Sequence, residues 1–357
     1  MKRKTASVAS LIASLVLALS GCGQKASDSG DTAEQQSPGD SGQYTSDSSE
    51  QQPLPPSEEP LVIRIGADSY NFSYQFRVAE AVGIFDKYNI DATISTFSFG
   101  IDTINAAILG ETDSAEGMDY AVASRFSESN NLRIVAHICG PNSDGEKLYV
   151  RDPSVNSVTD LAGKKLGVKK GTVNEFIWGK VFENYNIDPE SVEQVYLGSS
   201  AELLAAYQTD NIAAFWGTPD IEEAILAVPG TKILGDYDLS KAVPRGYLLL
   251  DNDFIQANKA GVTRLLKALD EATDYIRDNP EETARIAYED LKVPEDAALE
   301  GIRKYTYDVR LSQEDLDHIT NVANWSIEHG LIKNKYDITQ FLYLDALREA
   351  LPDKISV

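Results

Sequence analysis

The chain has 357 residues and a formal net charge of −24, with 56 Asp and Glu residues against 32 Lys and Arg residues. This acidic balance, without a dense cluster of basic residues, argues against nucleic acid as a partner. The stretch after residue 60 has ordinary globular composition, and its ~300 residues favour two lobes over a single core.

The N-terminal residues predict an export signal. Lys2, Arg3 and Lys4 precede an apolar run of ~15 residues, which is shorter than the ~20 residues of a membrane-spanning helix. Leu-Ser-Gly-Cys at 19–22 resembles a bacterial lipobox. We therefore expect 1–21 to be a cleaved lipoprotein signal peptide and Cys22 to carry lipid, which would anchor the protein on the extracellular face of the bacterial cytoplasmic membrane. The alternative is an ordinary cleaved signal with an incidental cysteine.

Residues 22–60 predict a disordered tether, because they are mostly Ser, Gly, Gln, Pro and acids with almost no large apolar side chain. Such a segment cannot bury enough surface to offset its ordering entropy. The chain has two cysteines, and with Cys22 lipidated Cys139 has no intramolecular partner. We expect Cys139 to be a core thiol.

The first globular part alternates short strands with helices. The pattern predicts strands over 60–68, 90–98, 112–118 and 132–140, and helices over 73–88, 101–110 and 120–129. This alternation is typical of an α/β fold with a mainly parallel sheet.

A second unit is expected from about 149 to 245, with strands over 165–168, 191–200 and 212–220 and helices over 173–186 and 201–210. A further strand over 246–255 leads into a helix over 260–280 whose apolar residues follow helical spacing. Three more helical stretches are predicted up to the C-terminus.

Four turns follow predicted strands and are the candidate ligand site. In parallel sheets, ligands bind beyond the carboxyl ends of the strands, where helix N-termini offer unpaired N–H groups. The turns cover 68–74, 98–100, 116–119 and 170–175. Ser98, Thr172 and Asn174 add hydroxyl or amide groups, and Gly100 and Gly171 let the backbone approach a ligand closely.

Each of these residues also has a structural alternative. Thr172 and Glu175 fit a capping box, so Glu175 either caps its helix or contacts ligand, whereas Glu202 is expected only to cap. The two glycines would also suit tight turns. Tyr70, Phe72 and Tyr74 would suit either a core or a pocket. We expect Trp216, at a strand end, to line the cleft.

The order of these features resembles a known family. The segments "IRIGADSYNFSYQFRVAEAVGIFDKYNID" and "TFSFGIDTINAAILGETDSAEGMDYAVA" are followed by "VTDLAGKKLGVKKGTVNEFIWGKVFENYNIDPESVEQVYL", "AELLAAYQTDNIAAFWGTPD" and "LDNDFIQANKAGVTRLLKALDEATDYIRDNPEE". Together with the lipobox they resemble the solute-binding lipoproteins of ABC importers in the nitrate/sulfonate/taurine group, which also contains binders of thiamine-pyrimidine precursors.

The resemblance implies an α/β, two-lobed periplasmic-binding-protein fold of type II with two crossovers and a ligand cleft between the lobes. Lobe 1 would comprise 61–148 and 246–357, and lobe 2 would comprise 149–245. The implied protein is a monomer that captures a small organic solute and presents it to an ABC permease and ATPase complex, with no cofactor, metal or catalytic residue. The implied ligand contacts are Asp68, Tyr70, Phe72, Ser98, Phe99, Gly100, Gly117, Asp119, Lys170, Gly171, Thr172, Asn174, Glu175, Trp216 and Pro219.

The charges near the expected cleft depart from an anion site. Glu116 and three of the implied contacts are carboxylates that would repel sulfonate or nitrate, and Lys170 is the obvious nearby cation. An aromatic, hydrogen-bonding or amine-bearing ligand stays open. Two other functions also stay open. One is a membrane-anchored ligand sensor, and the other is an enzyme like the thiamine-pyrimidine synthase group. The enzyme alternative lacks a cysteine-rich segment. His137 lies in an apolar predicted strand, and His318 and His329 lie in predicted C-terminal helices far in sequence from the expected cleft turns.

Overall fold

The computed structural model describes residues 59–357 of the chain. The expectations for the signal peptide, for lipid on Cys22 and for the tether up to residue 58 lie outside these residues. The described residues belong to one compact unit. Within the part that is described, no helix combines the length and the apolar character that crossing a bilayer requires.

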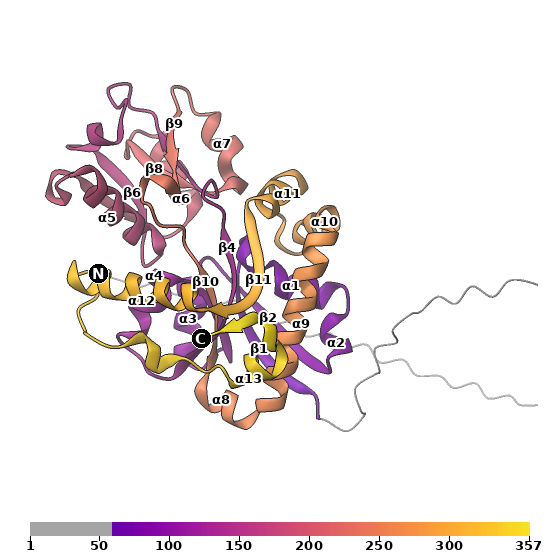
Figure 1. Ribbon diagram of the computed structural model, residues 1–357. Helices are drawn as coiled ribbons and strands as arrows, with labels where there is room; N and C mark the ends of the chain where they lie inside the picture. Colours follow the sequence, from indigo (N-terminus) through magenta and orange to yellow (C-terminus); the bar gives the residue numbers. More distant parts are fainter. Residues whose placement is uncertain (1–58) are drawn as a thin grey trace, which may run out of the picture. The chain divides into compact units, whose positions relative to one another are not determined.

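Lobe 1 is built on a seven-stranded sheet of order β12-β11-β4-β10-β3-β1-β2 (Figure 1). β1 runs parallel to β2 and β3, whereas β10 is antiparallel to both β3 and β4. The strands are β1 (Leu61–Asp68), β2 (Ile90–Phe97), β3 (Ser114–Met118), β4 (Leu132–Pro141), β10 (Gly246–Asp251), β11 (Tyr305–Ser312) and β12 (Ile355–Ser356).

Helices surround this sheet. They are α1 (Tyr74–Ala81), α2 (Ile84–Lys87), α3 (Gly100–Ile108), α4 (Asp119–Phe126), α8 (Asn252–Ala257), α9 (Lys259–Asp278), α10 (Pro280–Leu291), α11 (Glu295–Arg303), α12 (Gln313–Glu328) and α13 (Asp345–Ala350), with 3-10 turns η1 (Asn71–Ser73), η6 (Ile338–Phe341) and η7 (Pro352–Lys354). The predicted spacing of α9 is confirmed, because Val262, Leu265, Leu266 and Leu269 are all buried on one side of it.

Lobe 2 is built on a five-stranded sheet of order β7-β6-β8-β5-β9. Its strands are β5 (Lys147–Val150), β6 (Lys165–Lys169), β7 (Glu193–Leu197), β8 (Ala214–Gly217) and β9 (Lys232–Asp236). Its helices are α5 (Val173–Tyr185), α6 (Ser200–Gln208) and α7 (Glu222–Leu226), with 3-10 turns η2 (Val158–Leu161), η3 (Pro189–Ser191), η4 (Pro219–Ile221) and η5 (Tyr237–Leu239).

The chain passes between the lobes twice, from β4 to β5 and from β9 back to β10 (Figure 1). The predicted α/β, two-lobed architecture with two crossovers is therefore confirmed. The predicted lobe limits at 148 and 245 stay predictions, and β5 already begins at Lys147.

Several predicted elements are corrected by the structure. Both sheets are mixed rather than mainly parallel. In lobe 1, β10 returns from lobe 2 and enters between β3 and β4 in the opposite direction, and in lobe 2, β5 is antiparallel to β8 and β9. Only helical stretches were predicted after residue 280, but residues 305–312 form strand β11, in which Val309 and Leu311 alternate into the core as a strand requires. The helix predicted over 73–88 is divided at Gly83, which has a left-handed φ of 76°. Strands β5 and β9 were not predicted.

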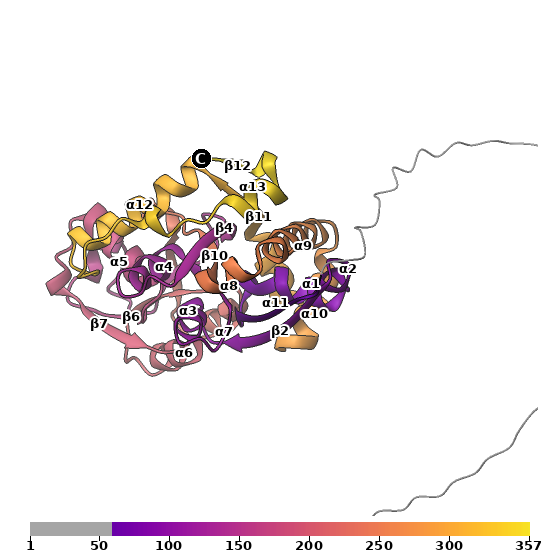
Figure 2. The ribbon, with the colours of Figure 1, turned by 90° about the horizontal axis from the view of Figure 1, so that it is seen from below.

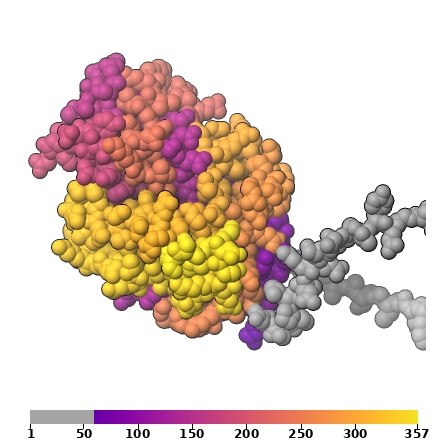
Figure 3. Space-filling model, viewed as in Figure 1, coloured from indigo at the N-terminus to yellow at the C-terminus, as the bar shows by residue number. Residues whose placement is uncertain are grey.

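The C-terminal helix α12 joins the cores of both lobes. Val322 of α12 and Tyr120 of α4 belong to the buried cluster of lobe 2. Trp325 packs edge-on against Phe176 of α5, with ring centroids 5.2 Å apart. α12 lies along α4 and near α5 in Figure 2, and the yellow C-terminal segment meets lobe 2 in the space-filling view (Figure 3). The prediction for Cys139 is confirmed, since it is a buried free thiol.

Candidate functional site

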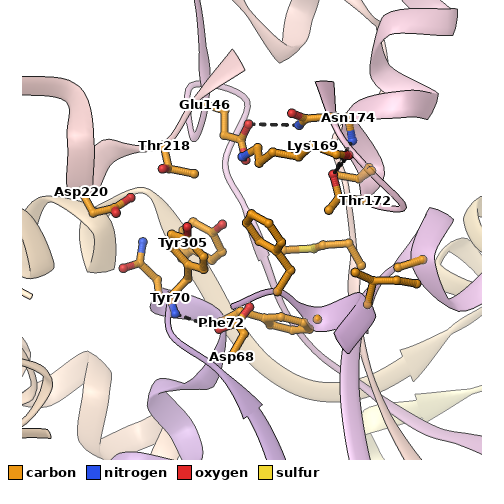
Figure 4. Close-up of a pocket in the computed structure, with 17 residues that line it drawn as sticks. Asp68, Tyr70, Phe72, Glu146, Lys169, Thr172, Asn174, Thr218, Asp220 and Tyr305 are labelled. Carbon is orange, nitrogen blue, oxygen red and sulfur yellow. Dashed lines mark hydrogen bonds and ion pairs between the residues drawn. The ribbon is translucent and has the colours of Figure 1, made fainter. Parts of the chain in front are cut away.

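A pocket lies between the two lobes, and strand ends and helix starts from both of them form its walls. It encloses about 640 Å³ when its open mouth and the adjoining solvent are included. Its lining consists of Asp68, Tyr70, Asn71, Phe72, Phe99, Gly100, Ile101, Met118, Ala121, Glu146, Lys169, Thr172, Val173, Asn174, Thr218, Asp220 and Tyr305. Figure 4 shows Asp68, Tyr70 and Phe72 across from Glu146, Lys169 and Asn174.

The carboxyl end of β1 places Asp68 at the bottom of the lobe 1 wall. The Asp68 carboxylate accepts a hydrogen bond from the Tyr70 amide at 2.9 Å, and the Asp68 amide donates to Glu116 at 2.6 Å. Burial raises the pKa of Asp68 to about 7. Burial, together with the charge of Asp68, raises the pKa of Glu116 well above its ordinary value. Two carboxyl groups therefore share one poorly solvated region behind the pocket.

Aromatic rings form most of the remaining lobe 1 wall. Tyr70 and Phe99 lie parallel within 2°, with ring centroids 5.9 Å apart. Phe72 and Tyr305 also line the pocket, and Phe72 is buried. Burial raises the pKa of the Tyr70 phenol above its ordinary value, so the hydroxyl stays neutral and able to donate. This wall offers flat apolar surface with few charges.

The lobe 2 wall is polar and contains an ion pair. Lys169, the last residue of β6, donates to Glu146 at 3.2 Å, and only 6% and 8% of these two side chains are exposed. Asn174 in the first turn of α5 donates its amide to the second Glu146 oxygen at 3.4 Å. Thr172 caps α5 by accepting a hydrogen bond from the Asn174 backbone amide at 3.3 Å. The three side chains at this wall are thus held in a connected network.

Two buried polar atoms on the lobe 2 wall lack a hydrogen-bond partner among the described residues. They are Oδ1 of Asn174 and Oγ1 of Thr218. Asp220 follows in η4 and is half-buried at the pocket. Burial raises the pKa of the Asp220 carboxyl. Buried polar atoms without partners are costly, so the Asn174 oxygen is ready to accept a hydrogen bond and the Thr218 hydroxyl is ready to donate or accept one.

Direct contacts between the lobes surround the pocket. The Tyr70 hydroxyl and the Ser200 hydroxyl are 2.7 Å apart, and the Tyr120 hydroxyl donates to Glu175 at 2.6 Å. Gly171 has a left-handed φ of 74°, and a β-carbon there would lie 3.2 Å from Ile101 of the other lobe. A residue without a side chain is thus favoured where the lobes approach most closely.

Seven of the predicted contacts line the pocket. They are Asp68, Tyr70, Phe72, Phe99, Gly100, Thr172 and Asn174. Lys170, Gly171 and Glu175 instead line a neighbouring hollow on the outer side of Phe99 and Ile101. Their roles as ligand contacts stay predictions.

Five predicted contacts line neither the pocket nor the neighbouring hollow. For two of them, Asp119 and Trp216, contacts inside the protein explain the difference. Asp119 is buried, and its carboxylate is within 2.6 Å of His318 Nε2 and accepts from the Arg245 amide at 3.1 Å. Trp216, expected to line the cleft, is fully buried and stacks on Tyr237 in the lobe 2 core. The remaining residues are Ser98, Gly117 and Pro219.

The capping alternatives are now distinguished. Glu202 accepts from the Gly198 amide at 2.8 Å, which confirms that it caps α6. Glu175 accepts from the Gly171 amide at 2.7 Å, and its other oxygen makes the interlobe bond to Tyr120. Glu175 therefore both caps the start of α5 and makes a contact between the two lobes.

Ten lining residues are absent from the predicted contacts, and five of them bear on the chemistry of the site. Lys169 was passed over for the adjacent Lys170, because the doubled lysine leaves open which of the two faces the pocket. Thr218 and Asp220 flank the predicted Pro219, so the correct loop was predicted but its pocket-lining residues were not. Glu146 and Tyr305 come from the beginnings of β5 and β11, which were not predicted as strands, and no motif marked them.

The fold and the pocket define a two-lobed protein of the periplasmic-binding-protein type. The aliphatic sulphonate binding protein of Escherichia coli has a similar structure, with a TM-score of 0.70 at 20% identity over 80% of this chain and 92% of that one. The alkanesulfonate-binding protein of Xanthomonas axonopodis, bound to MOPS, gives a TM-score of 0.71 at 16% identity over 81% and 100%.

The sequence comparisons agree with the fold. A protein of Brucella abortus named as a binding protein is 26% identical over 241 residues, which cover 65% of this chain and 72% of the relative. Residues 73–283 match the family described as NMT1/THI5 like. The chain belongs to the NMT1/THI5-like family, and the family resemblance seen in the sequence is confirmed.

Proposed function

We propose that the protein is the extracytoplasmic solute-binding component of an ABC importer, which captures a small organic solute in the interlobe pocket and presents it to a membrane permease. The observation that carries this proposal is that both lobes contribute walls to one pocket while touching through the bond between Tyr70 and Ser200. A ligand between such walls stabilises the closed arrangement of the two lobes, and a permease can bind that arrangement selectively.

The names of the similar proteins support this function. Two similar structures are sulfonate-binding proteins, one of them named as periplasmic, and the Brucella relative is named as a binding protein. We further propose that the protein is a monomer that acts with a permease and an ATPase, and that lipid on Cys22 holds it at the extracellular face of the membrane. Fractionation of cells that express the full chain tests the anchor, because Cys22→Ala should move the protein from the membrane to the soluble fraction.

We propose a binding role rather than catalysis. None of the lining residues is a histidine or cysteine, so the described pocket offers no nucleophile paired with an imidazole base. Within residues 59–357, no three His, Cys, Asp or Glu side chains gather as a metal site would need. Mass spectrometry of a bound compound after prolonged incubation tests this proposal. An unchanged compound supports binding, and steady conversion would support the enzyme alternative.

A thermal-shift screen of sulfonates, nitrate, pyrimidines and amines tests the central proposal. Calorimetry on any compound that raises the melting temperature should then show that Asn174→Ala weakens binding by about tenfold, because Asn174 lines the pocket with a free acceptor. Asn211→Ala, at an exposed site on lobe 2, is the matched control and should bind normally. Equal affinity in the unmodified protein, Asn174→Ala and Asn211→Ala would mean that the ligand binds elsewhere, which would contradict the proposed site.

A further inference from the structure

The charges that face the pocket are unbalanced. Three carboxylates line it, from the end of β1, the start of β5 and η4, and they are Asp68, Glu146 and Asp220. Lys169 is the one cation among the lining residues of the described chain. An anionic solute would therefore meet carboxyl groups without a free cation to pair with, whereas a cationic solute would stabilise their ionised form.

The single lysine is already engaged. Its ammonium group pairs with Glu146, whose second oxygen accepts from the Asn174 amide, so this carboxylate and this cation neutralise each other inside the wall. Neither Asp68 nor Asp220 forms an ion pair with any residue of 59–357. Arg77 is the nearest candidate, but it pairs with Asp290 at 2.7 Å and reaches only the backbone oxygen of Asp68. Two carboxyl groups are left to meet a ligand.

Buried acceptors add an observation that does not depend on charge. Asn174 is 1% exposed, and its amide nitrogen is fixed by donation to Glu146, so its carbonyl oxygen remains without a partner. Thr218 is 7% exposed, and its hydroxyl also lacks a partner. A carbonyl oxygen accepts hydrogen bonds only, so the ligand that satisfies Asn174 must carry a donor.

The opposite wall suits a flat or apolar body. Tyr70 and Phe99 present parallel rings, and Phe72 and Tyr305 extend the aromatic surface. Aromatic faces attract cations as well as apolar groups. From the unpaired carboxyls, the free acceptors and the aromatic wall together, we infer that the ligand is a small organic cation, a protonated amine with N–H donors on an apolar or aromatic body. This inference rests on the proposed function and names its solute class.

Matched compounds that share a carbon skeleton and carry a cationic, neutral or anionic head group test the inference on the full chain. One set is 2-phenylethylamine, 2-phenylethanol and 2-phenylethanesulfonate, and a second set is butylamine, butanol and butanesulfonate. Calorimetry near neutral pH should show the amine binding at least about tenfold tighter than the other two members of a set, since a charged hydrogen bond is worth that much. An alcohol or sulfonate that binds as well as its amine, or the absence of amine binding in both sets, would overturn the inference.

Two variants test whether the carboxylate of Asp220 causes the preference for the amine. Asp220→Asn should weaken amine binding about tenfold while changing alcohol binding less than about twofold, because it removes a charge and keeps the side-chain shape. Glu223→Gln, an exposed carboxylate in the neighbouring α7, is the matched control and should change neither. Equal losses for amine and alcohol in Asp220→Asn would contradict a charge-based role. Solute binding itself would be contradicted only if the wider screen also yields no compound that binds, so the two failures are distinguishable.

Discussion

The two walls of the pocket differ in how their side chains are held. On lobe 1, the aromatic rings of Tyr70 and Phe99 present a flat surface in front of the buried carboxyl of Asp68. On lobe 2, Lys169 and Glu146 form a buried ion pair beside acceptors that have no partner. The difference shows a division of roles, because one wall provides shape and the other provides hydrogen-bonding specificity, and a complete site exists only when the lobes meet.

The largest expected effect is on the lobe 2 wall. Lys169→Met should lower the free energy of unfolding by about 3 kcal/mol, because it leaves the carboxylate of Glu146 buried without its cation. Urea denaturation measures this loss. Lys165→Met on the same strand is the matched control and should cost less than about 1 kcal/mol, since the Lys165–Glu193 pair is exposed. Similar losses at the two positions would show that the inner pair is solvated.

The lobe 1 wall should respond to pH instead. The pKa of Asp68 is about 7 in the folded protein, against an ordinary value of 3.8, so the folded state holds the proton more tightly. Its contribution to stability is complete below about pH 4 and is lost as the pH rises to about 7. The stability of the protein relative to Asp68→Asn should therefore fall across this range, by on the order of 3 kcal/mol.

Urea denaturation of both proteins at a series of pH values measures that trend. Asp253→Asn, an exposed position in α8, is the control and should keep a constant difference from the unmodified protein. A difference for Asp68→Asn that stays flat or rises with pH would mean that the carboxylate is ionised in the folded state.

The contact between the walls should have a smaller effect. Tyr120→Phe removes the interlobe hydrogen bond to Glu175 and should weaken binding of a screened ligand about fivefold, because closure loses about 1 kcal/mol. Calorimetry measures the affinity. Tyr196→Phe, an exposed tyrosine bonded to Gln194 within lobe 2, should bind normally. If both variants bind like the unmodified protein, the contact does not contribute to closure.

The smallest effect is expected at the second capping glutamate. Glu202→Ala removes the bond from the Gly198 amide at the exposed start of α6 and should cost about 0.5 kcal/mol of unfolding free energy. Ligand affinity should not change, because Glu202 makes no interlobe bond. A loss of affinity as large as that of Tyr120→Phe would show that α6 takes part in closure beyond the contact of Ser200.

The two crossovers were implied by the family resemblance, whereas the sequence by itself determined the alternation of strands and helices and the turns where the pocket forms. These features follow from local periodicity and from capping residues, as at Thr172 and Glu202, which act within a few residues of the chain. The helical spacing of α9 was predictable for the same reason. The burial of Cys139 was predicted instead from its lack of a cysteine partner.

Only the tertiary structure decided which side chains face the pocket. Lys169 and Lys170 are equivalent in composition, but strand geometry sends successive side chains to opposite faces, and the phase depends on the register of β6 in its sheet. Glu146 and Tyr305 reach the pocket from segments 159 residues apart in the chain, which only the packing of the two lobes brings together. The ion pair, the free acceptors and the aromatic wall are long-range arrangements, and no local pattern encodes them.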